Sequence, residues 1–146
     1  MTQRQAFARR IDALAAIVAF TDAALAPSSL DEARRLAVHL AIEELFTNMV
    51  KYSPAGAPTI SIEISCADGG ADVTLIDAGV EAFDPTRAPA VRTDRPLAQR
   101  EPGGLGIHLA RRLVDAMDYE HDAERREART RFRVGPATRG DDHAQH

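Results

Sequence analysis

Cysteine is nearly absent from this sequence, in which Cys66 is the only one. A single cysteine can form neither an intrachain disulfide nor a cysteine metal cluster. The sequence also lacks an apolar run of about 18 residues and a small-residue cleavage site after an apolar stretch, so we expect no membrane span and a cytoplasmic protein. Positive net charge is lacking too. The formal net charge is -4, so no global positive field would recruit nucleic acid or an anionic membrane.

The length and composition fit one folded domain. With 146 residues, the chain can build one hydrophobic core but hardly two. Its content of 45% hydrophobic and 27% charged residues is ordinary for a soluble globular protein. We expect one domain over residues 1–135, followed by a polar, disordered tail at 136–146.

Two helices are predicted in the first third of the chain. Residues 11–25 carry a loose helical stripe of apolar side chains, namely Ile11, Leu14, Val18 and Leu25. Ser29 followed by Glu32 has the spacing of a capping box, which would begin a helix from Leu30 to about Tyr52. The apolar stripe of this second helix has the 3.6-residue period and consists of Val38, Ile42, Leu45 and Met49.

An antiparallel β-hairpin is predicted next. Residues 59–66 alternate apolar and polar side chains, and residues 71–77 return with Val73 and Leu75 facing inward. The Asp68-Gly69-Gly70 segment between them is a hairpin turn signal.

The second half of the chain has a weaker pattern. Residues 85–102 contain four of the eight prolines and no hydrophobic period, which is typical of a long loop that acts as a lid or binding segment. A helix is expected from Gly106, with an apolar face made of Leu109, Leu113 and Met117. Residues 129–134 have the pattern of a last strand.

The first candidate site motif is Glu44 and Asn48 on the predicted second helix. Residues four apart project from the same helix face, so a carboxylate and an amide would lie side by side. An amide oxygen can ligate Mg²⁺, and a carboxylate can orient or deprotonate a nucleophile. Many exposed helices carry such a pair, so this motif alone does not establish a site.

The second motif is Asp77-Ala78-Gly79, at the end of the hairpin. An aspartate that ends a buried strand can accept a hydrogen bond from an exocyclic amine such as that of adenine, and a glycine lets a ligand approach the backbone. An ordinary Asp-Gly turn has the same sequence.

The third motif is Gly103-Gly104-Leu105-Gly106, between the proline-rich loop and the following helix. Glycines at a helix N-terminus expose backbone N–H groups and the positive end of the helix dipole to a phosphate. A flexible hinge would also fit. The segment is neither a P-loop nor a dinucleotide-binding pattern, since no Lys-Ser/Thr follows it and no strand leads directly into it.

The order of these motifs is more specific than any one of them. Together they resemble the N, G1 and G2 boxes of the GHKL ATPases, over residues 7–134. Residues 44–52 and the Phe-Asp-Pro segment after the second motif are similar to the anti-sigma factor serine kinase branch. The resemblance implies an α+β Bergerat fold. This is a two-layer α/β sandwich whose mixed, mostly antiparallel sheet is covered on one face by helices.

The resemblance also implies roles for individual residues. Asn48 would coordinate Mg²⁺, and Glu44, rather than the neighbouring Glu43, would be the general base. Asp77 would bind the adenine amine, with Gly79 clearing space beneath the ring. The phosphates of ATP would be bound by the glycine loop and by arginines of the lid, namely Gly103, Gly104, Leu105, Gly106, Arg100, Arg92 and Arg95.

Two departures from the family pattern affect these expectations. The N-terminal strand is not evident in residues 1–10, where we expect it to be short or lost, and this leaves open whether the protein is a monomer or a homodimer. Glu81 stands where a small residue is typical, and Thr130 is the candidate for the family's threonine in the last strand.

Three functions follow as hypotheses. In the first, the protein transfers the ATP γ-phosphate to a serine or threonine of a STAS-type anti-anti-sigma partner and sequesters a sigma factor. In the second, it binds ATP or ADP as a partner switch without efficient kinase activity. In the third, it serves only as an interaction scaffold. Self-phosphorylation on histidine is not expected, since no histidine precedes His39.

Overall fold

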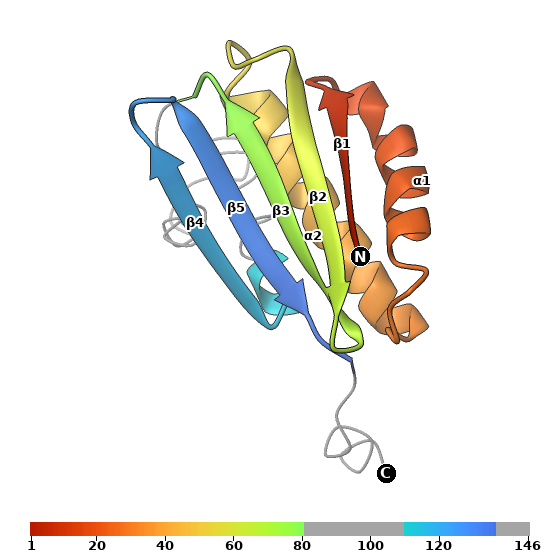
Figure 1. Ribbon diagram of the computed structural model, residues 1–146. Coiled ribbons are helices and arrows are strands. Elements are labelled where there is room, and N and C mark those ends of the chain that lie inside the picture. Colours follow the sequence, from red (N-terminus) through yellow and green to blue (C-terminus); the bar gives the residue numbers. More distant parts are fainter. Residues whose placement is uncertain (81–109, 137–146) are drawn as a thin grey trace, which may run out of the picture.

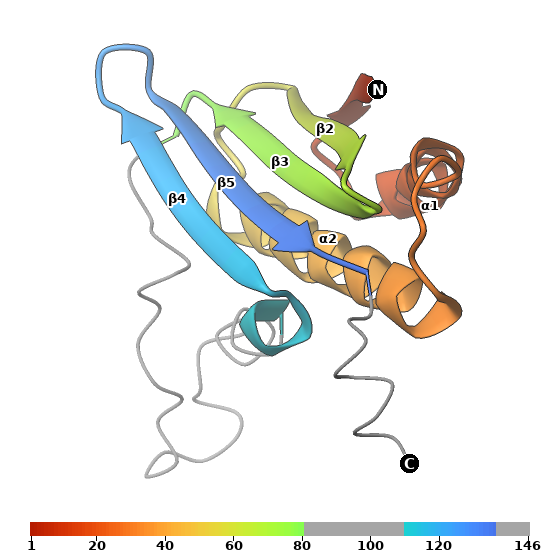
Figure 2. The same cartoon turned by 60° about the horizontal axis from the view of Figure 1, so that its bottom comes forward.

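In the part of the chain that the structure describes, five strands form one sheet, and the helices cover one face of it. The computed structural model describes residues 1–80 and 110–136. The strand order is β1-β2-β3-β5-β4, and every pair of neighbours is antiparallel. Figures 1 and 2 show α1 and α2 on the same side of the sheet, while no described element covers its other, open side. The predicted two-layer α+β fold is confirmed.

The N-terminal strand is present, so the expectation that it is short or lost is wrong. β1 (Thr2–Ala8) pairs along its whole length with β2 (Thr59–Ala67), from Thr2 opposite Ser65 to Ala8 opposite Thr59. It lies at the sheet edge, and Phe7 is its only buried residue. An edge strand of this kind is held by backbone hydrogen bonds and carries no alternating apolar pattern for sequence reasoning to detect.

The predicted hairpin is correct. β2 and β3 (Gly70–Ala78) pair with Ile62 opposite Leu75, and both side chains are fully buried. Asp68 and Gly69 form the turn with positive φ angles of 54° and 78°. Two such residues in a row are characteristic of the tight turns whose twist matches the flanking strands.

The predicted apolar stripe of the first helix is correct only in part, since Leu25 is buried and Leu14 packs against the core while its other two residues do not. A 3₁₀ turn, η1 (Ile11–Ala13), leads into α1 (Leu14–Ala24), whose buried residues are Ile17, Thr21 and Ala24. Ile11 and Val18 are about half exposed, at 45% and 48%. The helix is apolar almost all round, so its sequence could not indicate which side packs on the sheet.

The second helix, α2 (Glu32–Tyr52), has the predicted core face, and Val38, Ile42 and Leu45 are buried. Its start differs from the prediction because the N-cap is Asp31, not Ser29. The Asp31 side chain accepts a hydrogen bond of 2.8 Å from the backbone N–H of Arg34. A carboxylate at this position satisfies a free helix N–H and complements the helix dipole, so it takes the place of the expected capping box.

A strand that the sequence did not indicate lies at the other edge of the sheet. β4 (Ala116–Asp122) pairs with β5 (Glu127–Val134), which begins two residues before the predicted last strand. Met117 lies in β4, opposite Phe132, and not in the helix predicted from Gly106, whose described part ends at residue 113. β4 contains mainly polar residues, so its period-2 pattern is weak.

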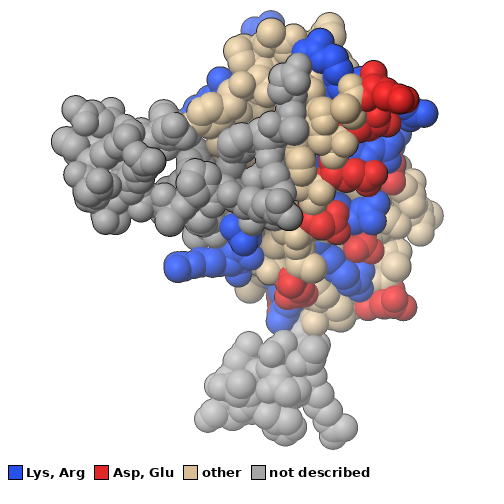
Figure 3. Space-filling view, turned by 90° about the vertical axis from the view of Figure 1, so that its left-hand side faces the viewer, with Lys and Arg blue, Asp and Glu red and all other residues tan. Residues whose placement is uncertain are grey.

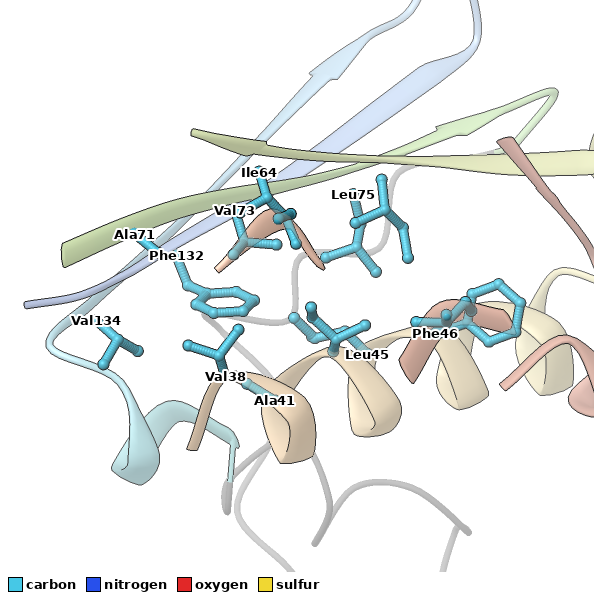
Figure 4. Close-up of a cluster of buried hydrophobic side chains, with 14 of the residues drawn as sticks. Val38, Ala41, Leu45, Phe46, Ile64, Ala71, Val73, Leu75, Phe132 and Val134 are labelled. Atoms are coloured by element: carbon cyan, nitrogen blue, oxygen red, sulfur yellow. The ribbon is translucent and has the colours of Figure 1, made fainter. Parts of the chain in front are cut away.

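The core lies between α2 and the covered face of the sheet. Figure 4 shows Val38 and Leu45 of α2 opposite Val73 and Phe132 of the strands, and Phe46 further along α2. All five are buried to 2% exposure or less. This packing fixes α2 beneath β3, and it thereby sets the positions of the candidate site residues on both elements.

The open face of the sheet carries charges of both signs. Arg133 of β5 contacts Asp72 of β3 at 2.9 Å, and Arg129 contacts Glu127 at 3.0 Å. Figure 3 shows basic and acidic side chains interspersed on the β4 side of the molecule. Among the described residues, no helix is both long enough and apolar enough to cross a membrane.

Candidate functional site

Asp77 lies at the inner face of the sheet, near the end of β3. The backbone alternation that buries Val73 and Leu75 also directs the Asp77 side chain inward, and Asp77 is only 3% exposed. The Asp77 carboxylate forms an ion pair with the guanidinium of Arg9 through Oδ1. A carboxylate at this depth requires such a partner, since an unpaired buried charge is costly.

Arg9 is the residue of this site that sequence reasoning missed. It directly follows β1, and its side chain is only 5% exposed. Besides Asp77, its guanidinium donates hydrogen bonds to three backbone carbonyls. These are Ala57 O at 2.7 Å, Ala78 O at 3.4 Å and Met49 O at 3.5 Å. Arg9 thus joins the end of α2, the loop before β2 and the end of β3.

Burial raises the pKa of the Asp77 carboxyl above its usual value of 3.8, while the hydrogen bond and the positive charge of Arg9 act in the opposite direction. His121 of β4 lies in the same cross-strand row as Asp77, and its Nε2 lies 2.9 Å from the backbone oxygen of Val80. Perturbed carboxylates of this kind occur both in binding sites and in structural ion pairs, so the pair marks this end of the sheet as a candidate site.

Gly79 has a backbone conformation that suits glycine. Its φ angle is +71°, in the left-handed region that other residues rarely adopt. A Cβ atom at this position would lie 3.2 Å from the backbone nitrogen of Ala57. That nitrogen donates a 2.9 Å hydrogen bond to Ala78 O, so Gly79 keeps the loop before β2 close to the end of β3.

Asn48 lies on the sheet-facing side of α2 and is 6% exposed. Its Nδ2 donates a 2.7 Å hydrogen bond to the backbone oxygen of Glu44. Its Oδ1 is buried and has no hydrogen-bond partner within residues 1–80 and 110–136. An amide oxygen without a partner is costly in a protein interior, so this oxygen is available to a water, an ion or a ligand.

Glu44 lies one helical turn before Asn48 and is half-buried, whereas Glu43 is exposed. The structure brings Asn48 and Asp77 to the same region, because Arg9 contacts both Asp77 and the carbonyl of Met49, the residue that follows Asn48. Glu44 belongs to the same helix face, as its i, i+4 relation to Asn48 requires.

Other predicted site residues lie outside the described part of the chain. This applies to Glu81, to the segment 85–102 with its arginines, and to the glycine loop with Gly103, Gly104, Leu105, Gly106 and Arg100. Thr130, the candidate threonine of the last strand, is buried on β5 opposite Leu75 of β3.

The chemistry of the described residues fits a magnesium-bound adenine nucleotide. The unpartnered Asn48 Oδ1 is a hard oxygen ligand of the kind that Mg²⁺ accepts while it keeps waters and phosphate oxygens. The Asp77 carboxylate can accept from an amine, and Gly79 has no side chain to obstruct a ring. These residues therefore supply an acceptor for an amine and an oxygen ligand for a metal ion.

Comparison with known proteins agrees with the two-layer α+β fold of the chain. The chain belongs to the histidine kinase-like ATPase domain family, whose sequence profile matches residues 7–132. The resemblance to GHKL ATPases that the three motifs predicted is thereby confirmed. No curated protein sequence shows significant similarity to the chain.

The chain is similar to several solved structures, of which two are named. The crystal structure of the RsbU and RsbW domains of Rv1364c from Mycobacterium tuberculosis is 18% identical, with a TM-score of 0.63 over 94% of this chain. The chain spans 35% of that protein's length. The Acinetobacter baumannii histidine kinase AdeS is 13% identical over 93% of this chain and 68% of its own, with a TM-score of 0.47. At such identities, the likeness of the first structure concerns the fold.

Proposed function

We propose that this protein binds Mg²⁺-ATP and transfers the γ-phosphate to a serine or threonine of a STAS-type anti-anti-sigma partner, and that it sequesters a sigma factor. The observation that carries the nucleotide site is the buried, unpartnered Oδ1 of Asn48 in a histidine kinase-like ATPase domain. The similarity of residues 44–52 to the anti-sigma kinase branch and the likeness to a structure that contains an RsbW domain favour this class of partner.

In the proposed site, Asn48 contributes its amide oxygen to the metal, and Asp77 accepts a hydrogen bond from the 6-amino group of adenine. Gly79 leaves room for the purine ring beside the backbone. The glycine loop 103–106 and Arg100 bind the phosphates in this proposal. Bound Mg²⁺ would neutralise charge that develops on the phosphates.

Glu44 is the proposed general base. Its carboxylate accepts the proton of the partner's hydroxyl group as the hydroxyl oxygen bonds to the γ-phosphorus and ADP leaves. A half-buried carboxylate on the same helix face as Asn48 suits this role, because it is held near the metal site and is still accessible to a protein substrate.

Transfer would also release the partner. A phosphoserine or phosphothreonine adds about 1.5 to 2 negative charges at neutral pH. Because the chain itself carries a net charge of -4, the modified partner meets repulsion at the interface. The protein can then exchange one partner for the other.

The direct test is transfer of radiolabelled phosphate from ATP to purified STAS-domain proteins, with Mg²⁺ present and with EDTA. We expect label on a serine or threonine of one STAS protein only when Mg²⁺ is present. If the chain binds no ATP with Mg²⁺ present, the nucleotide site itself is wrong.

A nucleotide-binding switch without efficient kinase activity is the second candidate. One observation favours it: the Glu44 side chain has no hydrogen-bond or ionic partner among the described residues, whereas Asp77 and Asn48 are both held by hydrogen bonds. A general base is usually oriented by another group. Tight ATP binding by calorimetry, without label transfer to any STAS protein, would select this function.

The preference for an adenine base is expected to depend on pH. The ionised Asp77 carboxylate accepts a hydrogen bond from the amine more strongly than the neutral acid does, and burial raises the pKa of this carboxyl. Affinity for ATP, relative to a purine nucleotide without the amine, should therefore fall as pH is lowered from about 7 towards 4. Binding titrations measure this, and Asp77→Asn, which has no proton to gain, is the control and should give a flat ratio. A flat ratio in the unaltered protein would contradict the assignment.

A further inference from the structure

One arginine connects the sheet edge to the candidate base site. Arg9 follows the edge strand β1, and its backbone N–H donates a 2.9 Å hydrogen bond to Pro58 O. Its guanidinium contacts the Asp77 carboxylate and the carbonyls of Met49, Ala57 and Ala78. Each contact uses a donor in the plane of the guanidinium, so the group is fixed in both position and orientation.

The loop before β2 makes room for this guanidinium. A Cβ atom at Gly56 would overlap it, and would lie 2.5 Å from Arg9 Cζ and 3.0 Å from Arg9 Nη1. Real Cβ atoms do not approach other heavy atoms so closely, so the absence of a side chain at Gly56 is a condition for the observed position of Arg9. The atoms in the way belong to the end of a flexible side chain, and a residue larger than glycine would displace them.

The buried ion pair between Arg9 and Asp77 is expected to contribute little to the stability of the fold. The side chains of Arg9 and Asp77 are 5% and 4% exposed. Removing two charges from water costs free energy that their attraction often does no more than offset, so apolar residues would serve the core equally well. The pair has a geometric consequence, however. Arg9 binds Oδ1 of Asp77, and within the described part of the chain Oδ2 has no hydrogen-bond partner.

We propose that Arg9 is a positioning residue for base recognition: it fixes the Asp77 carboxylate through Oδ1, so that Oδ2 is presented to the 6-amino group of adenine. The inference rests on the proposed ATP site and adds a residue that acts on the base through Asp77. Arg9 also opposes protonation of Asp77, since a guanidinium within hydrogen-bond distance favours the carboxylate over the neutral acid.

The test compares two nucleotides in the full chain. Titrations with Mg²⁺ present measure the affinity for ATP and for purine riboside triphosphate, which has hydrogen in place of the 6-amino group. We expect Arg9→Met to lower the preference for ATP about tenfold, with little change for the second nucleotide, because a misplaced carboxylate affects only the amine contact. Arg9→Lys retains the charge and one donor, and should restore part of the preference.

A second variant tests the same role of Arg9 in case Arg9→Met does not fold. Gly56→Ala keeps the arginine and displaces its guanidinium, so it should also lower the preference for ATP. In Asp77→Asn, the additional Arg9→Met change should leave the preference unaltered, as expected for residues that act as one unit. Thermal unfolding shows which variants are folded.

Three results would overturn the inference. An unchanged preference for ATP in the folded variants would do so, and so would an equal loss of affinity for both nucleotides, which would make Arg9 a purely structural residue. If the unaltered chain binds neither nucleotide, the proposed ATP site fails, and the inference fails with it.

Discussion

Replacing Glu44 with glutamine is expected to lower phosphoryl transfer to the STAS partner by about 10²- to 10⁴-fold. Glutamine has nearly the same size and occupies the same half-buried position on α2, but it cannot accept the proton of the attacking hydroxyl. Affinity for ATP should change by less than about threefold, because the metal and base contacts are assigned to Asn48 and Asp77. Single-turnover label transfer and calorimetry measure the two quantities.

Glu43 supplies the matched control for this variant. It is the adjacent residue on α2 and carries the same functional group, but it is exposed and lies off the face of Asn48. Glu43→Gln should transfer phosphate at the unaltered rate. If Glu44→Gln also transfers at that rate, or if Glu43→Gln shows the larger loss, Glu44 is not the general base.

Where a segment is buried on a regular face, its sequence predicted its structure. Ile60, Ile62 and Ile64 alternate with polar residues, and all three are fully buried on one face of β2. Val38, Ile42 and Leu45 likewise form the core face of α2. These patterns exist because one side of each element packs against the other layer while the opposite side meets water.

Edge elements could not be predicted in the same way. β1 buries only Phe7, and no residue of β4 is fully buried. Their stability comes from backbone pairing with β2 and β5, and the backbone is the same in every sequence. β1 was expected to be short or lost, and β4 was missed because its Met117 also fitted a helical period.

The candidate site likewise contains residues that the sequence could predict and one that it could not. Glu44, Asn48, Asp77 and Gly79 could be selected because each belongs to a short motif with a chemical reason for its spacing. Arg9 was not selected, since its partner Asp77 is 68 residues away and Arg10 beside it carries the same functional group. The nearest signal is its place two residues after Phe7, because alternation along a strand puts both residues on the inner face.

Asn48→Leu is expected to weaken Mg²⁺-dependent ATP binding by about 100-fold without loss of stability. Leucine has a similar shape to asparagine but no oxygen for the metal. It also removes the buried Oδ1 that has no partner in the described part of the chain. The free energy of unfolding should therefore be unchanged or higher by about 1 kcal/mol, since leucine also favours the helix.

Affinities measured with Mg²⁺ and with EDTA separate the metal-dependent part of binding, and denaturant unfolding gives the stability. Thr21→Val is the matched control. Thr21 Oγ1 is the other buried oxygen without a partner among the described residues, but it lies on α1. Its replacement should also leave stability unchanged or higher, while ATP binding stays as it is. Loss of binding together with equal or greater stability is expected of a residue retained for its ligand. Unchanged Mg²⁺-dependent binding in Asn48→Leu, or a large loss of stability, would instead make Asn48 an ordinary core residue.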